Sequence, residues 1–263
     1  AAAFGLIVSI FTIHLGDESG YLVAKDQPAK MAAMEAAWET VPAPAPMTIF
    51  GLPDEENQVT RANVEIPWLF GIIATRSLDT PIPGIKDLIE QNTQRIQNGI
   101  VAMQTLTALR KDPDNAALRE QFSAVKDDLG YGMLLRKYTE DPSRATPEMI
   151  AQAAQDTIPG VNIMFWSFRA MVGCGIALLL VFAFGLYYSA KDLITSRRWL
   201  LKASFLALPL PWIACELGWM VAEYGVNRGV FMKFSPCIFP LPHCLSEVSW
   251  ARLSVLFFCI PPF

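Results

Sequence analysis

The most informative pattern in this sequence is the placement of long runs without charged residues. The run from Ala170 to Ala190 has no charge and, as a helix, is long enough to cross the hydrocarbon core of a bilayer. A second run, from Ala203 to Tyr224, is interrupted only by Glu216 and Glu223. A third, from Ala1 to Leu15, is too short to span alone, and we interpret it as the end of another transmembrane helix. The pattern predicts a polytopic membrane protein.

Residues 16–160, which follow the run that ends at Leu15, have a different pattern. Apolar residues recur at helical spacing over Ile85–Lys111 and again over Asp114–Tyr138, on a polar background. Thr146 followed by Pro147 is typical of a helix start, and predicts a third, short helix. The earlier stretches 41–46 and 51–57 lack a period, and we expect them to be irregular. The segment is therefore predicted to be loop-like in front and helical behind.

Charge predicts the orientation. The connection from Lys191 to Lys202 holds four basic residues against Asp192, so the positive-inside rule places it in the cytoplasm. Residues 16–168 hold 21 acidic against 13 basic residues, and we expect them on the opposite, extracytoplasmic side. An acidic surface argues against a nucleic-acid partner. The five cysteines show no spacing that implies a disulfide framework.

These patterns together predict an all-α fold. We expect a fragment of a polytopic transmembrane helix bundle with a long, extracytoplasmic, partly helical loop. The predicted regions are the end of a transmembrane helix (1–15), the loop with a small helical subdomain (16–160), a transmembrane helix (161–190), a cytoplasmic loop (191–202), a second transmembrane helix (203–225) and a tail (226–263).

Several side chains in the apolar runs could carry chemistry. Arg169 and Met171 lie at the end of the first span that is nearer the loop. In the ordinary interpretation, Arg169 snorkels to the interface and Met171 fills the core. In the functional interpretation, the Met171 thioether binds haem iron and Arg169 pairs with a haem propionate. Glu216, Trp219 and Glu223 share one face of the second span, where carboxylates are costly and usually functional. Glu223 could also be interfacial.

Two charges in the loop stand in an alanine- and methionine-rich stretch, PAKMAAMEAAWE. Lys30 and Glu35 are five residues apart, which is not the spacing of a stabilising helix pair, so spacing alone indicates two solvated charges. The only histidines, His14 and His243, lie at opposite ends of the chain. No histidine-based metal site can be argued from them.

Four strings give the sequence a family resemblance. They are His14-Leu15-Gly16-Asp17-Glu18-Ser19-Gly20-Tyr21, Gly71-Ile72-Ile73-Ala74-Thr75-Arg76-Ser77, Phe168-Arg169-Ala170-Met171-Val172 and Gly218-Trp219-Met220-Val221-Ala222-Glu223-Tyr224-Gly225. In this order and spacing, the chain resembles subunit I of the cytochrome bd-type quinol oxidases, in the branch with a long quinol loop, over residues 1–225.

The resemblance implies roles for individual residues. Met171 would be an axial ligand of the low-spin haem b, with Arg169 beside it. Glu223 would be the axial carboxylate of the high-spin haem b, and Trp219 would pack near the haems. The quinol site would include the residues Lys30, Glu35 and Asp17. The family resemblance assigns no role to Glu216.

The resemblance also implies a mechanism. Quinol would be oxidised at the outer face, with Glu35 accepting a proton, and electrons would pass through the two haems b and haem d to oxygen. Turnover would charge a bacterial inner membrane, and the partners would be lipid, quinol, subunit II and small accessory subunits. The family's histidine ligands belong to earlier helices that this sequence lacks, so we do not expect the chain alone to be active.

The tail departs from the family. After Gly225 the family continues Gly-Arg-Gln-Pro-Trp, whereas here Val226 and Asn227 follow. Codons that encode residues 226–235 can be chosen so that one added base restores Arg-Gln-Pro-Trp. We therefore interpret residues 226–263 as out of frame, and expect no metal site at Cys237, His243 and Cys244.

One alternative fits the same physical patterns. A non-enzymatic membrane receptor or scaffold with an acidic helical domain outside would have the same spans and charges. Binding of haem by the membrane part distinguishes the two, because a receptor needs neither Met171 nor Glu223.

Overall fold

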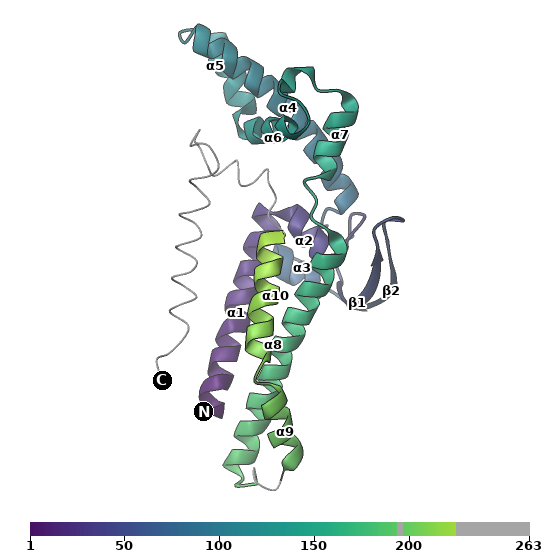
Figure 1. The fold of residues 1–263 in the computed structure, drawn as a ribbon, viewed down its shortest axis with the longest axis vertical. Coiled ribbons are helices and arrows are strands. Elements are labelled where there is room, and N and C mark those ends of the chain that lie inside the picture. Colours follow the sequence, from purple (N-terminus) through teal and green to yellow (C-terminus); the bar gives the residue numbers. More distant parts are fainter. Residues whose placement is uncertain (194–196, 225–263) are drawn as a thin grey trace.

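The computed structural model describes residues 1–193 and 197–224, and it is mostly helical. Three long helices form the bundle: α1 (Ala2–Asp26), α8 (Val161–Ala190) and α10 (Leu210–Tyr224), with the short α9 (Arg198–Leu206) leading into α10. Figure 1 shows α1 and α10 along α8, and the long loop between α1 and α8 gathered toward one end of the bundle. The all-α membrane fold is confirmed.

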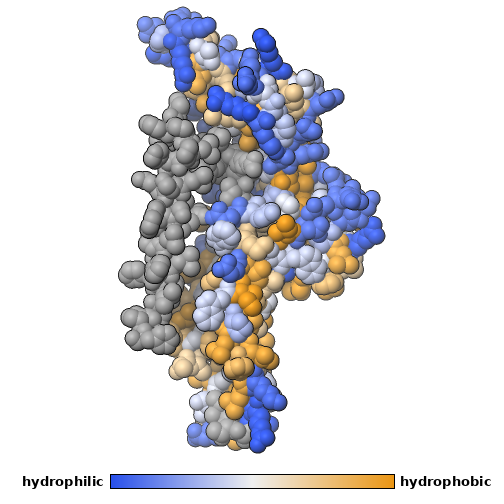
Figure 2. All heavy atoms as spheres, viewed as in Figure 1, coloured by the Kyte–Doolittle hydropathy of each residue, from blue (hydrophilic) through white to orange (hydrophobic). Residues whose placement is uncertain are grey.

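Within residues 1–193 and 197–224, two helical segments are long and apolar enough to cross a membrane, namely Val161–Ala190 and Arg198–Tyr224. The break between α9 and α10 falls at Pro209, where a proline cannot donate the helical hydrogen bond. Figure 2 shows hydrophobic residues along the bundle, and hydrophilic residues over the loop and at the opposite tip. This distribution is the one expected of a membrane-spanning bundle with polar ends.

The first helix is longer than its apolar run. It continues past Leu15 to Asp26, so the charged string around Asp17 is helical. Close packing fixes α1 on α8: a β-carbon at Gly5 would lie 2.7 Å from the ring of Phe182. The absence of a side chain at Gly5 lets the aromatic ring of α8 approach the α1 backbone.

The front of the loop is more ordered than its sequence predicts. After α2 (Pro28–Glu35), strands β1 (Met47–Asp54) and β2 (Val59–Ile66) form an antiparallel hairpin, followed by the short α3 (Leu69–Thr75). The prediction that 51–57 is irregular was wrong for 51–54, which lie in β1. Two irregularities in the strand register break the alternation of inward and outward side chains, and so hide the strand in the sequence.

The rear of the loop is helical, as its apolar spacing predicted. Helix α4 (Ile85–Lys111) has the expected bounds, and α7 (Pro147–Gln155) begins where the Thr146 hydroxyl caps the Met149 amide. Between them the chain is broken into α5 (Ala116–Val125), η1 (Lys126–Asp128), α6 (Leu129–Met133) and η2 (Leu134–Lys137), and η3 (Pro142–Arg144) precedes α7. The subdomain has its own small core, formed by Ile96, Tyr131, Leu135, Ala153 and Ala154.

The main core lies where the loop meets the bundle. Helix α2 is buried there between the start of α8, the end of α1 and the start of α4, and Val221 of α10 joins the same cluster. Met164 and Phe165, near the start of α8, are fully buried against it. The loop is therefore packed onto the bundle by apolar side chains, and residues of α2 are held at this junction.

Candidate functional site

Helix α2 is a short, almost completely buried helix. Pro28 occupies its first turn, where no hydrogen-bonded N–H is needed, and Ala36 ends it in the left-handed conformation with φ of 50°. Its alanines give it a narrow surface that neighbouring helices can approach closely. Its two charged side chains are buried with it: Lys30 is 8% exposed and Glu35 is 5% exposed. They are therefore not the solvated charges that their spacing indicated.

Glu35 is paired with an arginine of the bundle. Its Oε2 atom lies 3.2 Å from Nη2 of Arg169, and it also accepts the backbone N–H of Thr48 in β1 at 3.1 Å. A buried carboxylate is costly unless it is paired and hydrogen-bonded, and these contacts provide both. The pair joins a predicted quinol residue to a predicted haem-binding residue.

Burial dominates the protonation of Glu35. Desolvation raises the pKa of this carboxyl from 4.5 to about 7, although Arg169 and the Thr48 amide both act to lower it. The nearby charge of Glu65 in β2 also raises the pKa. A carboxyl with a pKa near neutral can both take up and release a proton under physiological conditions. This property fits the predicted role of Glu35 as a proton acceptor.

Arg169 makes contacts with three different elements. Its Nη1 donates to the Met34 carbonyl of α2 at 2.6 Å and to the Phe165 carbonyl of its own helix, and its Nη2 also donates to the Thr48 carbonyl of β1. The guanidinium lies 3.4 Å above the centre of the Phe165 ring. Its Nε is buried and has no hydrogen-bond partner within the described part of the chain. A buried donor without an acceptor is costly and calls for an explanation, such as an acceptor on a bound group.

Lys30 points toward a different helix of the bundle. Its Nζ donates to the backbone carbonyl of Ala222 in α10 at 3.3 Å. Ala222 directly precedes Glu223, the predicted ligand of the high-spin haem. The two charges of α2 thus reach toward the two helices that carry the predicted haem ligands, α8 and α10.

Asp17 lies apart from Lys30 and Glu35. It forms an ion pair of 2.7 Å with Arg76, which also contacts Glu18 at 3.2 Å and lies over the ring of Tyr21. This contact joins the two strings around Asp17 and Arg76, so α1 and the end of α3 are held together. The sequence assigned no role to Arg76, although its position within a family-like string was a signal.

Of the predicted haem residues, Met171 faces the neighbouring helix of the bundle, whereas Trp219 and Glu223 are exposed. A β-carbon at Gly218 of α10 would lie 3.2 Å from the sulfur of Met171, so the sulfur packs against this glycine. Trp219 is 58% exposed, and Glu216 and Glu223 are exposed as well. The Met171 sulfur of α8 therefore faces α10, whereas the Glu223 carboxylate of α10 is exposed.

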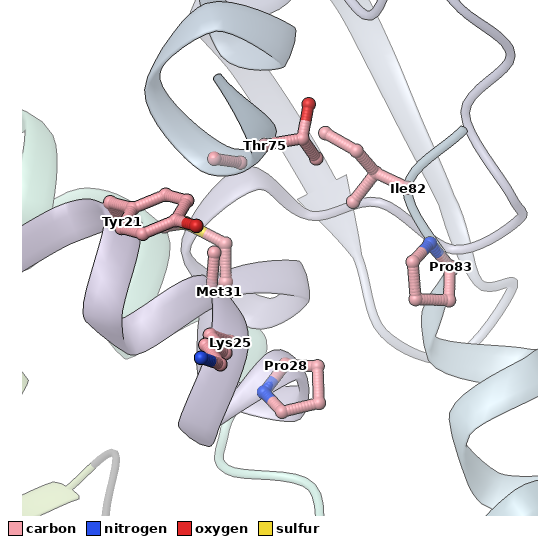
Figure 3. Close-up of a pocket in the computed structure, with 9 residues that line it drawn as sticks. Tyr21, Lys25, Pro28, Met31, Thr75, Ile82 and Pro83 are labelled. Atoms are coloured by element: carbon pink, nitrogen blue, oxygen red, sulfur yellow. The ribbon is translucent and has the colours of Figure 1, made fainter. Parts of the chain in front are cut away.

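A pocket of about 350 Å³ opens beside α2, at the junction of α1, α2 and α3 (Figure 3). Its walls are mainly apolar, and two of its polar side chains are the hydroxyl-bearing Tyr21 and Thr75. The lining residues are Tyr21, Ala24, Lys25, Pro28, Met31, Ala74, Thr75, Ile82 and Pro83. None of the three predicted quinol residues lines it. An apolar pocket with a few polar groups is the usual form of a small-molecule site.

Comparison with known proteins decides the family. The model of the family described as cytochrome bd terminal oxidase subunit I matches residues 1–227. The chain belongs to this family. It is 42% identical over 224 residues to cytochrome bd-II ubiquinol oxidase subunit 1 of Escherichia coli K12, covering 85% of this chain and 44% of that protein. It is 23% identical over 211 residues to cytochrome bd ubiquinol oxidase subunit 1 of Bacillus subtilis 168, covering 79% of this chain and 33% of that protein.

The chain therefore spans less than half the length of these bd oxidase relatives. Membership in a family of terminal oxidase subunits makes the receptor or scaffold interpretation the weaker one. The family match ends at residue 227, and the predicted out-of-frame tail lies outside the described residues. The frameshift stays a prediction.

The residues of this bd oxidase chain fit a haem. Arg169 offers a buried donor without a partner in residues 1–193 and 197–224, which suits a propionate oxygen. Met171 places a thioether beside a residue without a side chain, so the sulfur is not enclosed by bulky groups on that side. Glu223 offers an exposed carboxylate.

Proposed function

We propose that this chain forms the quinol-oxidising part of a bd-type terminal oxidase. The intact subunit, together with subunit II and possible small accessory subunits, would oxidise quinol at the outer face of a bacterial inner membrane and reduce oxygen to water. The observation that supports this most strongly is the buried contact between Glu35 in the loop and Arg169 in the bundle. It connects the predicted quinol residues with the predicted haem residues.

In this proposal, haem supplies the electron transfer when bound, and the protein supplies ligands and proton control. Met171 would hold low-spin haem b through its thioether sulfur, and Arg169 would pair with a carboxylate of the haem. Glu223 is the proposed ligand of high-spin haem b, with Trp219 near it, and haem d belongs to the complete site. Residues 16–160 are proposed to be extracytoplasmic, because the connection Lys191–Lys202 is basic.

Quinol oxidation releases protons, and this chain offers a carboxyl to take one. Glu35 would accept a proton as the quinol is oxidised, since a carboxyl with a pKa of about 7 can exchange protons near neutral pH. Lys30 would complete the site on α2, and Asp17 would support it through Arg76. The neighbouring apolar pocket, which Met31 of α2 lines, is the proposed place for the apolar tail of the quinol, with the ring toward Glu35.

An oxygen electrode tests this proposal on membranes that contain the intact subunit and its partner. Reduced quinol should drive oxygen uptake, and Glu35→Gln should lower the rate by about 10²–10⁴-fold, the usual contribution of a proton-transferring group. Glu39→Gln is a matched control, because Glu39 is exposed and its carboxylate pairs with Lys86. Equal rates in the parent and in Glu35→Gln would remove Glu35 from the mechanism.

A further inference from the structure

The most heavily engaged side chain at the junction of loop and bundle is Arg169. Four of its hydrogen bonds lead from the two terminal nitrogens, three of them to the quinol loop and one to its own helix. The loop acceptors are the Met34 carbonyl, the Glu35 carboxylate and the Thr48 carbonyl. The last carbonyls of a helix lack partners within the helix, so the contact with Met34 fixes the end of α2.

These contacts also fix the position of the Glu35 carboxylate. Its Oε2 is held from one side by Arg169 and from the other by the Thr48 amide of β1. Arg169 reaches the same residue of β1 through the Thr48 carbonyl. A closed arrangement results, in which α2, β1 and α8 are each bonded to the other two.

We propose that Arg169 is a positioning residue for quinol oxidation, whose planar fork holds the end of α2 and strand β1 on α8 and so sets the place of the Glu35 carboxylate. This inference rests on the proposed function, because it assigns Glu35 to the quinol site. It adds a role to the one that the family resemblance implies for Arg169, which concerns the haem alone.

The chemistry of the fork explains why an arginine is needed. A guanidinium directs several N–H donors in fixed directions, whereas a lysine ammonium is a single compact charge on a flexible stem. A lysine at this position would keep the positive charge near Glu35 and near a haem propionate. It could not bond Met34, Glu35 and Thr48 together in the same geometry. Arg169→Lys therefore keeps the positive charge at residue 169 but removes the planar arrangement of N–H donors.

The experiment uses the intact oxidase, as the parent, as Arg169→Lys and as Arg95→Lys. Arg95 is the matched control, since it also combines an ion pair, with Asp128, a hydrogen bond to Tyr131 and a contact with the ring of Tyr131, but in the remote subdomain. Amide hydrogen exchange is followed at residues 29–36 and 47–51, and the KM for quinol, kcat and the haem spectrum are measured on the same samples.

The proposal predicts that Arg169→Lys raises exchange at these two segments and the KM for quinol by about tenfold each, while the haem bands remain. Arg95→Lys should leave both segments unchanged. Unchanged exchange in Arg169→Lys, with only the haem spectrum altered, would overturn the proposal and leave Arg169 a haem partner only. Absence of haem from the parent would instead refute the proposed function.

A second variant covers the case in which Arg169→Lys does not assemble. Glu35→Gln keeps the shape of the side chain and one oxygen acceptor but removes its charge, which weakens its bonds to Arg169 and to Thr48. Exchange of the Thr48 amide should rise severalfold in this variant. An unchanged Thr48 amide would contradict the closed arrangement on which the proposal depends.

Discussion

Arg169 and Glu35 are 134 residues apart in the sequence, and their side chains form a buried ion pair with an N–O distance of 3.2 Å. The pair joins the loop to the membrane bundle at the point where the proposed quinol and haem chemistry meet. Breaking a buried pair leaves an uncompensated charge, so each partner depends on the other.

The stability of the protein should depend on the protonation of Glu35. Because burial raises its pKa to about 7, the folded state binds this proton more tightly than the unfolded chain, whose carboxyl has its ordinary value of 4.5. The favourable contribution is therefore fully present below pH 4.5 and is lost as the pH rises through about 7. Glu35→Gln should remove this dependence.

The measurement is the melting temperature of the intact protein between pH 4 and 8, for the parent and for Glu35→Gln. The difference between the two should change across the window from about 4.5 to 7 and be constant outside it. A difference that is constant over the whole range would show that the carboxyl keeps its ordinary pKa.

The contact between Met171 and Gly218 predicts a second effect. A β-carbon at Gly218 would approach the Met171 sulfur to 3.2 Å, and a larger side chain would displace it. Gly218→Leu should therefore weaken or abolish the low-spin haem absorbance of the intact oxidase. Gly175→Leu is the control on α8, because a β-carbon there meets no described atom within 4 Å. Equal spectra in the two variants would contradict the placement of the ligand.

Asp17 should matter more for quinol than for stability. Its pair with Arg76 is partly exposed, at 34% for each side chain, and such pairs contribute about 1 kcal/mol or less. Asp17→Asn should thus lower the melting temperature little but raise the KM for quinol, because it loosens α1 from α3 beside the proposed pocket. Asp26→Asn serves as the control, because Asp26 is an exposed carboxylate on the same helix. A large loss of stability with an unchanged KM would make Asp17 purely structural.

The helical subdomain should be separable from the site. Gly99 of α4 and Gly132 of α6 meet backbone to backbone, so a β-carbon at Gly99 would clash with the Gly132 backbone. Gly99→Ala should destabilise the subdomain by about 1–3 kcal/mol through overpacking. Hydrogen exchange in residues 85–155 should report this, with little change at residues 29–36. Gly160→Ala is the control, because space is open there.

Local patterns in the sequence predicted much of the fold. The bounds of α4 followed from its helical period, and the start of α7 from the capping threonine before a proline. The hairpin was missed because Gly51 and Pro53 disfavour a strand and the register is interrupted twice. The extension of α1 past Leu15 was missed because apolar runs mark membrane depth and not helix length.

The candidate site was less accessible to local reasoning. Spacing indicated that Lys30 and Glu35 are solvated charges, and only the family resemblance assigned them to a site. Their burial depends on helices that follow much later in the chain, and no local pattern encodes such a contact. The resemblance did not foresee that Asp17 would pair with Arg76, away from Glu35.

The central claim is that this chain belongs to a haem-containing quinol oxidase in which Met171 binds the low-spin haem. It is tested most directly by the reduced-minus-oxidised absorbance spectrum of membranes that contain the intact parent protein, Met171→Leu or Met164→Leu. Met164 is the control, as a fully buried methionine on the same helix. The account predicts low-spin haem b in the parent and in Met164→Leu, and its loss or shift in Met171→Leu. A parent without haem, or a low-spin signal indifferent to Met171→Leu, would contradict it.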